Sequence, residues 1–449
     1  MLLYAEHITP RLKYICDFLG RELLGEAFEL SSDKKDFQNL QNPCINYSRE
    51  SVNKNEFRIG PHSLLFETGI HSQPIDSFIS NHNKAFFQTQ GDFPFDVFAA
   101  SFYLMSRYEE YLPHEKDMYG RYAYKNSLAF QQGFLQLPLI NLWIRDFRHH
   151  LELKYPGYKF NDPKPQVSFL PTYDIDQAYS FKHKSFWKNA TGFLRSMAKG
   201  DLHAVKERRS VLSGKVKDPF DAYEWMDNLH RQFDLRPYYF FIIADKTGKY
   251  DKNISPQKKA MRELISEHFK QYTIGIHPSW QSGDIVTLLE KEIQQLSEIT
   301  GKPVTISRQH YIRFTLPQTF RYLINSGINN DFSMGYGSIN GFRASVASSF
   351  YWFDLEKNET TSLLLHPFCY MDANSFYEQH FSPRQGYEEM KHYYDSVRFV
   401  NGTMISIWHN NFLGTDKLYA GWKEAYEKFV SEISGHTPSV SAKVGDVLR

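Results

Sequence analysis

Gln166-Val-Ser-Phe-Leu-Pro-Thr-Tyr-Asp-Ile-Asp176 is the stretch that decides the fold, because it begins as an apolar strand and ends in two carboxylates. Strand side chains alternate between faces, so Asp174 and Asp176 are expected to point the same way. Two like charges this close are unfavourable unless a cation or a shared proton compensates them. The alternative is a capped loop, since Asp after a strand often bonds nearby backbone N–H groups. The pair alone leaves a site and a turn both open.

Composition excludes several classes of protein. At 449 residues the chain is too long for one ordinary core, so two or three domains are expected. The hydrophobic content of 41% and charged content of 23% are typical of a soluble globular protein, and a net charge of +1 argues against nucleic-acid binding. Cys16, Cys44 and Cys369 are far apart and odd in number, which predicts neither a disulfide framework nor a Cys-rich zinc site and fits a reducing compartment.

The first residues lack a basic stretch followed by a long apolar run, and no apolar stretch approaches membrane-spanning length. The expected location is therefore the cytoplasm. The aromatic content of 16% is high. Most of these rings are expected in the core, but Tyr and Trp also line clefts that bind sugars.

Residues 1–160 read as a separate mixed α/β unit. Residues 62–66 predict a short strand, and an apolar stripe predicts a helix over 94–111. On that helix Arg107 and Glu110 are expected to form an ion pair on a solvated face. The segment 154–165 has the turn-rich composition of a linker, so the domain boundary is placed there.

A basic stretch follows Asp176. Residues 182–217 contain ten Lys or Arg but only Asp201 and Glu207 as acidic residues. The simplest interpretation is the solvated face of a helical hairpin. The alternative is a positively charged surface that attracts a phosphate-bearing or lipid-linked substrate.

Strand and helix patterns alternate from residue 236 onward. The predicted strands cover 238–243, 272–277, 304–312, 362–366 and 403–408, and the predicted helices cover 258–271, 284–300, 317–326, 387–399 and 421–433. This spacing implies right-handed βαβ units and a mainly parallel sheet. About seven units would close into a complete or broken barrel, with chemistry at the C-terminal ends of its strands. The tail after Gly435 is polar and is expected to fray.

Polar groups recur at those predicted strand ends. They are Asp174 and Asp176, His277, Arg308 and His310, Arg343, His366, and His409. One Asp with two or three His, and a ligand position left open, is typical of a hydrolytic metal site. In such a site a second carboxylate takes a proton from water, and a separate His protonates the leaving group.

These residues resemble a known family. Thr172-Tyr-Asp-Ile-Asp176 is similar to the Thr-Phe-Asp-Asp signature of the polysaccharide deacetylases, carbohydrate esterase family 4, and Ile274-Gly-Ile-His277 resembles the start of its second motif. The resemblance is greatest to a Bacteroidetes-type branch with an N-terminal extension of unknown function. It rests on Arg308-Gln-His-Tyr311, Met334-Gly-Tyr336, Gly341-Phe-Arg343 and Trp408-His-Asn410, and covers 166–435.

The resemblance implies a deformed (β/α)7 barrel that removes N- or O-acetyl groups from sugars. By position, Asp174 would be the general base, and Asp176 and His277 would be metal ligands. His409 would be the acid for the leaving group. His366 also lies in a sequence like the acid motif, so it competes with His409.

One position departs from the family pattern. The second motif usually has another His four residues after the first, where this chain has Gln281, and an amide is a poor zinc ligand. Either His310 supplies the third ligand or metal binding is weak or absent. Arg308 and Arg343 are candidates to orient Asp174 or to hold a substrate oxygen, and a structural ion pair is equally open for each.

The sequence therefore predicts a metal-dependent, most readily zinc-dependent, carbohydrate deacetylase acting on an acetylated sugar or glycan precursor. Two alternatives stay open: a catalytically degenerate glycan-binding or scaffold protein of the same fold, and an amide or imide hydrolase acting on a small molecule. No nucleic acid is expected as a partner, and the oligomeric state is left undetermined.

Overall fold

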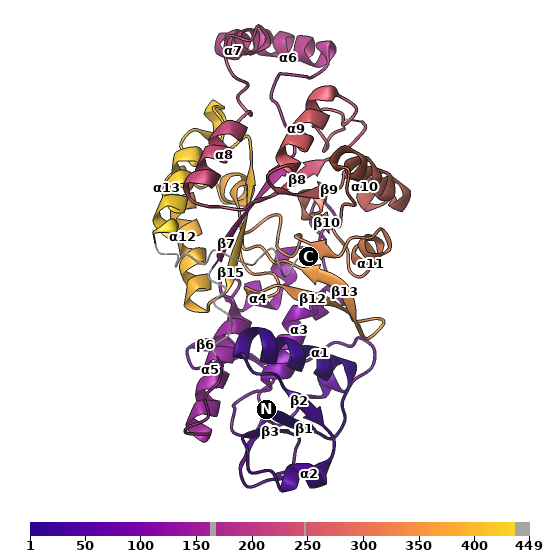
Figure 1. Ribbon diagram of the computed structural model, residues 1–449, viewed down its shortest axis with the longest axis vertical. Coiled ribbons are helices and arrows are strands. Elements are labelled where there is room, and N and C mark those ends of the chain that lie inside the picture. Colours follow the sequence, from indigo (N-terminus) through magenta and orange to yellow (C-terminus); the bar gives the residue numbers. More distant parts are fainter. Residues whose placement is uncertain (162–167, 247, 436–449) are drawn as a thin grey trace.

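The structure is a computed structural model, and it describes residues 1–161, 168–246 and 248–435. Two main sheets organise the chain (Figure 1). The first, near the N-terminus, has four strands in the order β2-β1-β3-β4, all parallel. The second has nine strands in the order β12-β13-β11-β10-β9-β8-β7-β15-β14. This curled α/β architecture is the broad fold class that the sequence predicts.

The N-terminal part is a mixture of short elements. They are β1 (Leu2–Ala5), α1 (Pro10–Phe18), η1 (Leu19–Leu24), β2 (Glu29–Ser31), α2 (Lys34–Gln38), β3 (Cys44–Tyr47), β4 (Glu56–Arg58), η2 (Ser63–Leu65), β5 (Phe78–Ser80), β6 (Asn83–Ala85), α3 (Val97–Met105), η3 (Tyr108–Tyr111), η4 (Tyr124–Asn126), α4 (Leu128–Gln131) and α5 (Leu139–Lys154).

The remaining elements build the large sheet and its helices. They are β7 (Ser168–Ile175), α6 (Phe186–Ala198), α7 (Leu202–Leu212), α8 (Tyr223–Gln232), β8 (Tyr238–Ile242), α9 (Lys259–Phe269), β9 (Thr273–His277), η5 (Gln281–Gly283), α10 (Val286–Thr300), β10 (Ile306–Ser307), η6 (His310–Ile312), α11 (Gln318–Asn325), β11 (Asn330–Asp331), β12 (Phe350–Asp354), β13 (Glu359–Leu365), β14 (Tyr370–Met371), η7 (Asn374–Glu378), α12 (Pro383–Phe399), β15 (Thr403–His409), η8 (Lys417–Tyr419) and α13 (Trp422–Ser434).

Strand β7 lies inside the large sheet, between β15 and β8. Both neighbours run parallel to it, so their C-terminal ends meet at one edge. Pro171 in β7 cannot donate a backbone hydrogen bond, and it lies just before the segment that pairs with β8, which begins at Thr172. Pro171 is therefore tolerated because β7 pairs with β8 only from Thr172 onward. Beyond that point β7 is paired on both sides, as it is at Asp174.

The alternation of strands and helices is regular only over part of the sheet. It holds from β8 to β11, where α9, α10 and α11 connect successive parallel strands. After β11 the chain forms the antiparallel hairpin β12-β13 instead. In the described residues β12 and β14 are the edges of the sheet, so its strand order is that of an open, curled half-barrel.

The two parts of the chain pack against each other through aromatic side chains. The rings of Tyr14 from α1 and Phe102 from α3 lie 5.0 and 5.2 Å from that of Phe353 in β12. The Tyr14 hydroxyl also donates to the Tyr351 carbonyl (2.7 Å). One hydrophobic core continues through both parts. The division into domains at 1–160 and 166–435 stays a prediction. Part of the predicted linker, 154–165, and the predicted tail, 436–449, lie outside the described residues.

Several local predictions are wrong. Residues 63–65 form the 3-10 helix η2 rather than a strand, and the helix predicted over 94–111 is only Val97–Met105, followed by η3. The predicted ion pair between Arg107 and Glu110 forms (2.7 Å), but Arg107 has a left-handed backbone conformation and a side chain only 1% exposed, so the pair is not on a solvated face. The strand predicted over 304–312 is only Ile306–Ser307. These errors occur where tertiary packing overrides the local pattern.

No helix among the described residues has both the length and the apolar character needed to cross a bilayer.

Candidate metal and catalytic site

The candidate site lies at the edge where the parallel strands end. Asp174 and Asp176 come from the end of β7, His277 from the end of β9, His310 from η6 just after β10, and His409 from the end of β15. Because parallel strands share the direction of their C-terminal ends, side chains more than 200 residues apart in sequence meet there. The alternation of side chains in β7 holds, since both aspartates approach the same imidazole.

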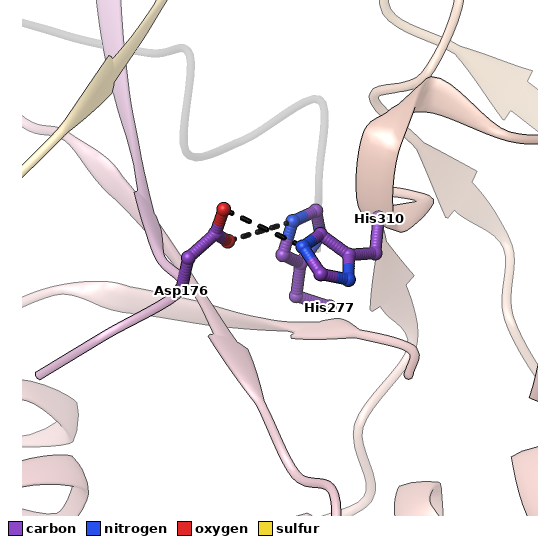
Figure 2. Close-up of side chains that lie close together, drawn as sticks. All are labelled: Asp176, His277 and His310. Carbon is purple, nitrogen blue, oxygen red and sulfur yellow. Dashed lines mark ion pairs between the residues drawn. The ribbon is translucent and has the colours of Figure 1, made fainter. Parts of the chain in front are cut away.

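Asp176, His277 and His310 form the centre of this cluster (Figure 2). Asp176 Oδ1 lies 3.3 Å from His277 Nε2, and Asp176 Oδ2 lies 3.4 Å from His310 Nε2. One ligand atom from each residue lies within 4.8 Å of the other two. Both histidines are buried, whereas the Asp176 side chain is 31% exposed. The cluster is therefore open on one side, as a site that admits a further ligand must be.

The other ring nitrogens fix how both imidazoles are used. His277 Nδ1 donates to the Arg308 carbonyl oxygen (2.5 Å), and His310 Nδ1 donates to the Asp251 carboxylate (3.0 Å). In the neutral rings each Nε2 is then an acceptor, and both face the acceptor oxygens of Asp176. Asp176 Oδ1 is itself buried without a hydrogen-bond partner. Acceptors arranged in this way fit a cation between them, and the Nδ1 contacts are those that typically orient metal-binding histidines.

The electrostatics of the cluster favour positive charge. Burial alone would raise the pKa of Asp176, but His310, His277 and His409 hold it well below the ordinary value. Burial would likewise lower the pKa of His310, but the Asp176 and Asp251 carboxylates raise it to about 9. The same field that holds a proton on an imidazole stabilises a bound cation.

Asp174 is held beside the cluster by a buried arginine. Arg308 Nη1 donates to Asp174 Oδ1 (2.8 Å), while Asp174 Oδ2 lies 3.7 Å from His277 Nε2. The Arg308 guanidinium stacks 4.3 Å above the ring of Phe240. A Cβ at Gly275 would lie 2.5 Å from that ring, so only glycine leaves room for Phe240 beneath the arginine. Gly275 therefore helps indirectly to hold Asp174 in place, because it leaves room for the Phe240 ring against which Arg308 stacks.

His409, the register neighbour of Asp174 on the adjacent strand β15, also approaches Asp176. Its Nε2 is 3.7 Å from Asp176 Oδ2, and its Nδ1 donates to Asp372 Oδ1 (2.7 Å). The other Asp372 oxygen accepts the His409 backbone N–H (2.7 Å). Burial would lower the pKa of His409, but Asp372, Asp176 and Asp174 raise it to about 10. The imidazole is therefore favoured in its protonated form, which is the form an acid needs.

The structure does not bring His366 and Arg343 into this cluster. Both ring nitrogens of His366 are engaged, Nδ1 by Ser349 (2.7 Å) and Nε2 by Asn330 (2.8 Å), and burial lowers its pKa to about 3. Arg343 forms a bidentate ion pair with Glu110 of the N-terminal part. Their contacts are those of buried structural groups, and between the two candidate acids the geometry favours His409.

The contacts also separate the two candidates for the third ligand. Gln281 is exposed in η5 and does not belong to the cluster, whereas His310 does. Gln281 instead helps to line a cavity of about 510 Å³, together with Tyr250, Asp251 and Trp280. Because Asp251 also bonds His310, the cavity adjoins the cluster.

Two of the residues that line the cavity, Tyr250 and Trp280, belong to a group of aromatic rings. Tyr250 and Trp280 stack with centroids 3.9 Å apart, and Tyr311 lies 5.4 Å from Trp280. Tyr119, from the N-terminal part, lies 5.2 Å from Tyr311, and Arg121 Nη1 donates to the Tyr311 carbonyl (2.6 Å). Residues of the N-terminal part thus contact the aromatic group beside the cavity.

Sequence reasoning missed two carboxylates. Asp251 lies in the loop after β8, and β8 lies between β7 and β9, which lead to Asp176 and His277. Its position after a parallel strand could therefore have identified Asp251 as a candidate site residue. Asp372 follows β14, which is only Tyr370–Met371 and leaves no recognisable strand pattern. Both act on a histidine by accepting its Nδ1–H, a contact that no local motif encodes.

Fold and site together define an α/β protein with an Asp-His-His group suited to a divalent metal. A family profile described as "Family of unknown function (DUF7033)" matches residues 1–156. No curated protein matches the chain.

Structural neighbours include proteins assigned as polysaccharide deacetylases. One from Mycobacterium smegmatis is 12% identical with a TM-score of 0.40, over 65% of this chain and 92% of the other. One from Pseudomonas aeruginosa PAO1 is 13% identical with a TM-score of 0.41, over 65% and 96%. Puue allantoinase is 13% identical with a TM-score of 0.40, over 63% and 92%. These values are too low to carry a functional argument, which therefore rests on the site.

Proposed function

We propose that this protein is a metal-dependent hydrolase that removes acetyl groups from a sugar or glycan precursor. The observation that carries the proposal is the convergence of Asp176, His277 and His310, with a second carboxylate, Asp174, and a His-Asp pair beside them. This is the set of groups that amide or ester hydrolysis at a metal requires. The resemblance of the Asp174–Asp176 and His277 motifs to those of polysaccharide deacetylases supports an acetyl group as the target.

In this proposal Asp176, His277 and His310 hold the cation, for which zinc is the best candidate because two imidazoles and a carboxylate suit it. When bound, a divalent cation polarises the carbonyl of the acetyl group and lowers the pKa of water. The chain supplies the proton transfers. Asp174 takes the proton from the attacking water, and Arg308 holds that carboxylate in place through its Nη1.

His409 donates the proton to the leaving nitrogen or oxygen. Its Nδ1 is tied to Asp372, so its Nε2 carries the proton on the side that faces the cluster. The Asp372 carboxylate also stabilises the charged imidazole before it donates. Asp174 and His409 both lie beside the cluster, so one can take the proton from the attacking water while the other protonates the leaving group.

The cavity beside the cluster supports a sugar as the substrate. Trp280 and Tyr250 line it with apolar surface, and Asp251 and Gln281 offer polar groups to hydroxyls. Aromatic residues beside a few polar groups are typical of a carbohydrate-binding surface. Tyr119 contacts Tyr311 next to Trp280, which brings the N-terminal part close to this surface.

The test measures metal content and acetate release from a panel of N- and O-acetylated sugars, for the protein as purified and after chelation with zinc restored. We expect about one bound metal ion per chain and release that depends on it. His310→Gln is expected to lose the metal, because it removes one of three ligands. Gln281→Ala is the matched control, and it is expected to keep the metal because Gln281 lies outside the cluster.

Three outcomes separate this proposal from its alternatives. Loss of metal in Gln281→Ala, with retention in His310→Gln, would remove the proposed ligand set. Sugar binding without release from any substrate of the panel would favour a glycan-binding protein. Turnover of cyclic amides or imides with none of acetylated sugars would favour a small-molecule amidohydrolase.

A further inference from the structure

The helical hairpin α6-α7 is the least packed helical element of the large-sheet part. In Figure 1 it projects beyond the sheet, at the end of the molecule opposite to the N-terminal strands. Helix α6 has no buried residue along its thirteen residues, and α7 has only Val211. Helices in proteins are normally stabilised by packing an apolar face against a core. The outer face of α6 has no such partner among the described residues.

That outer face is nonetheless apolar. Phe186 and Trp187 are each 75% exposed, Leu194 is 65% exposed and Met197 is 53% exposed. These positions, with Ala190 between them, are three or four residues apart or adjacent, so they form one stripe along the helix. Leu202, at the start of α7, is 74% exposed. Large apolar side chains gathered on one exposed element mark an interaction surface.

The hairpin is also strongly basic. Residues 182–217 carry ten Lys or Arg and two acidic residues, while the whole chain has a net charge of +1. Arg195, Lys199, Lys206, Arg209 and Lys215 are exposed. Two copies of such a surface repel each other, so a second copy of this chain is a poor occupant. The charge complements an anionic partner.

The base of the hairpin is fixed to the candidate site. The buried Asp218 carboxylate accepts the backbone N–H groups of Ser180, Phe181 and Lys182 at 2.7–2.9 Å, which joins the two ends of the hairpin. Asn253 then ties Ala178 to the Ile175 carbonyl at the end of β7. The hairpin is therefore held in a set direction, on the side of the sheet where Asp176 lies.

We propose that α6-α7 is a docking element for an anionic membrane surface. Helix α6 combines Trp and Phe with aliphatic side chains on one face and Lys and Arg around it, which is the composition of helices that lie in the membrane interface. Single-stranded nucleic acid is disfavoured, because Leu194 and Met197 are aliphatic and offer no ring for a base to stack on. Docking places the strand ends that carry the site toward the lipid. The inference concerns binding alone and does not depend on the proposed deacetylation.

The test is flotation of the full chain with vesicles of phosphatidylcholine alone, or of phosphatidylcholine mixed with phosphatidylserine. We expect binding to the mixed vesicles that weakens as salt is raised. The double variant Phe186→Ser with Trp187→Ser tests the apolar face, and Lys199→Glu with Arg209→Glu tests the charge. Each is expected to weaken binding about tenfold or more. Ile79→Ser is the matched control, since Ile79 is 62% exposed elsewhere and its loss is expected to change nothing.

All of these substitutions are at exposed positions, so the variants are expected to fold, and circular dichroism checks this. Equal binding by the wild type and the apolar double variant overturns the proposal, as does absence of binding to the mixed vesicles. Self-association or binding to single-stranded RNA that the apolar variant abolishes, without vesicle binding, also overturns it and identifies the other occupant.

Discussion

Two buried clusters of charged side chains in this protein are built in opposite ways. At the junction between the two parts of the chain, Glu110 pairs with both Arg107 and Arg343, and Arg107 also pairs with Glu109. At the candidate site, four carboxylates, from Asp174, Asp176, Asp251 and Asp372, share three imidazoles and the single guanidinium of Arg308. Two cations balance two anions at the junction, whereas the site has a surplus of negative charge.

The difference distinguishes a structural cluster from a functional one. At the junction Glu109 Oε2 also accepts the Leu128 N–H, so its charges are both paired and hydrogen-bonded. At the site Asp176 Oδ1 has no hydrogen-bond partner among the described residues, and the Nε2 atoms of His277 and His310 lie 3.3 and 3.4 Å from the carboxylate oxygens. A buried surplus of one charge is unfavourable unless a ligand of the opposite charge binds. We infer that the buried charges at the junction are structural because each is paired. The unpaired surplus of negative charge around Asp176 is what distinguishes the candidate metal site.

The largest expected difference is in catalysis. Asp174→Asn and Glu110→Gln each convert a carboxylate beside a buried arginine to an amide. Asp174→Asn is expected to lower acetate release about 10²- to 10⁴-fold, because it removes the general base. Glu110→Gln is expected to leave the rate per folded molecule unchanged. The measurement is release from the best substrate of the panel, at a temperature below both melting transitions. Equal effects of the two substitutions would contradict the distinction.

The next difference is in stability. Glu110→Gln leaves Arg107 and Arg343 buried without their shared counter-charge, and breaking a buried pair in this way costs about 3–5 kcal/mol of unfolding free energy. Urea unfolding of wild type and variant measures it. The control is Glu356→Gln. Glu356 forms an ion pair with Arg321 and its side chain is 47% exposed, so this substitution is expected to change the unfolding free energy by less than about 1 kcal/mol. A cost at Glu110 no larger than the control would show that the junction network is not stabilising.

The pH dependence of that cost is smaller and has a defined sign. Burial alone would raise the pKa of Glu110, but Arg343 and Arg107 lower it from 4.5 to about 2. The ionised form therefore stabilises the fold above pH 4.5, and this contribution is lost as the pH falls toward 2. The difference in unfolding free energy between wild type and Glu110→Gln should shrink over that range. A difference that grows on acidification would contradict the assigned pairing.

The smallest expected effect is on stability at the site itself. In the presence of a chelator, Asp176→Asn should cost less unfolding free energy than Glu110→Gln, because Asp251 and Asp372 still pair with His310 and His409, whereas Arg343 loses the carboxylate with which it pairs. The same variant is expected to lose bound zinc. Thermal unfolding with chelator and metal analysis without it provide the two readouts. A destabilisation as large as that of Glu110→Gln would place Asp176 among the structural charges.

Much of the framework was predictable from the sequence because it depends on local pattern. The buried strands β8, β9 and β15 and the helices α9, α10 and α12 follow from runs and stripes of apolar residues, within a few residues at each end. The polar residues after those strands then predicted where a site would form. A helical hairpin at α6-α7 was the simplest interpretation of the basic stretch 182–217, and it rested on charge rather than on apolar periodicity.

What only the tertiary structure decided is which groups meet. The pairs His310–Asp251 and His409–Asp372, the exclusion of His366, and the ion pair between Arg343 and Glu110, 233 residues apart, depend on the order of strands in space. The exposure of the apolar stripe on α6 was decided there too, since the sequence analysis recognised only the basic residues of this segment. Local pattern is set by neighbours a few bonds away, whereas charge pairing and burial are set by distances through space, and these exist only once the sheet has assembled.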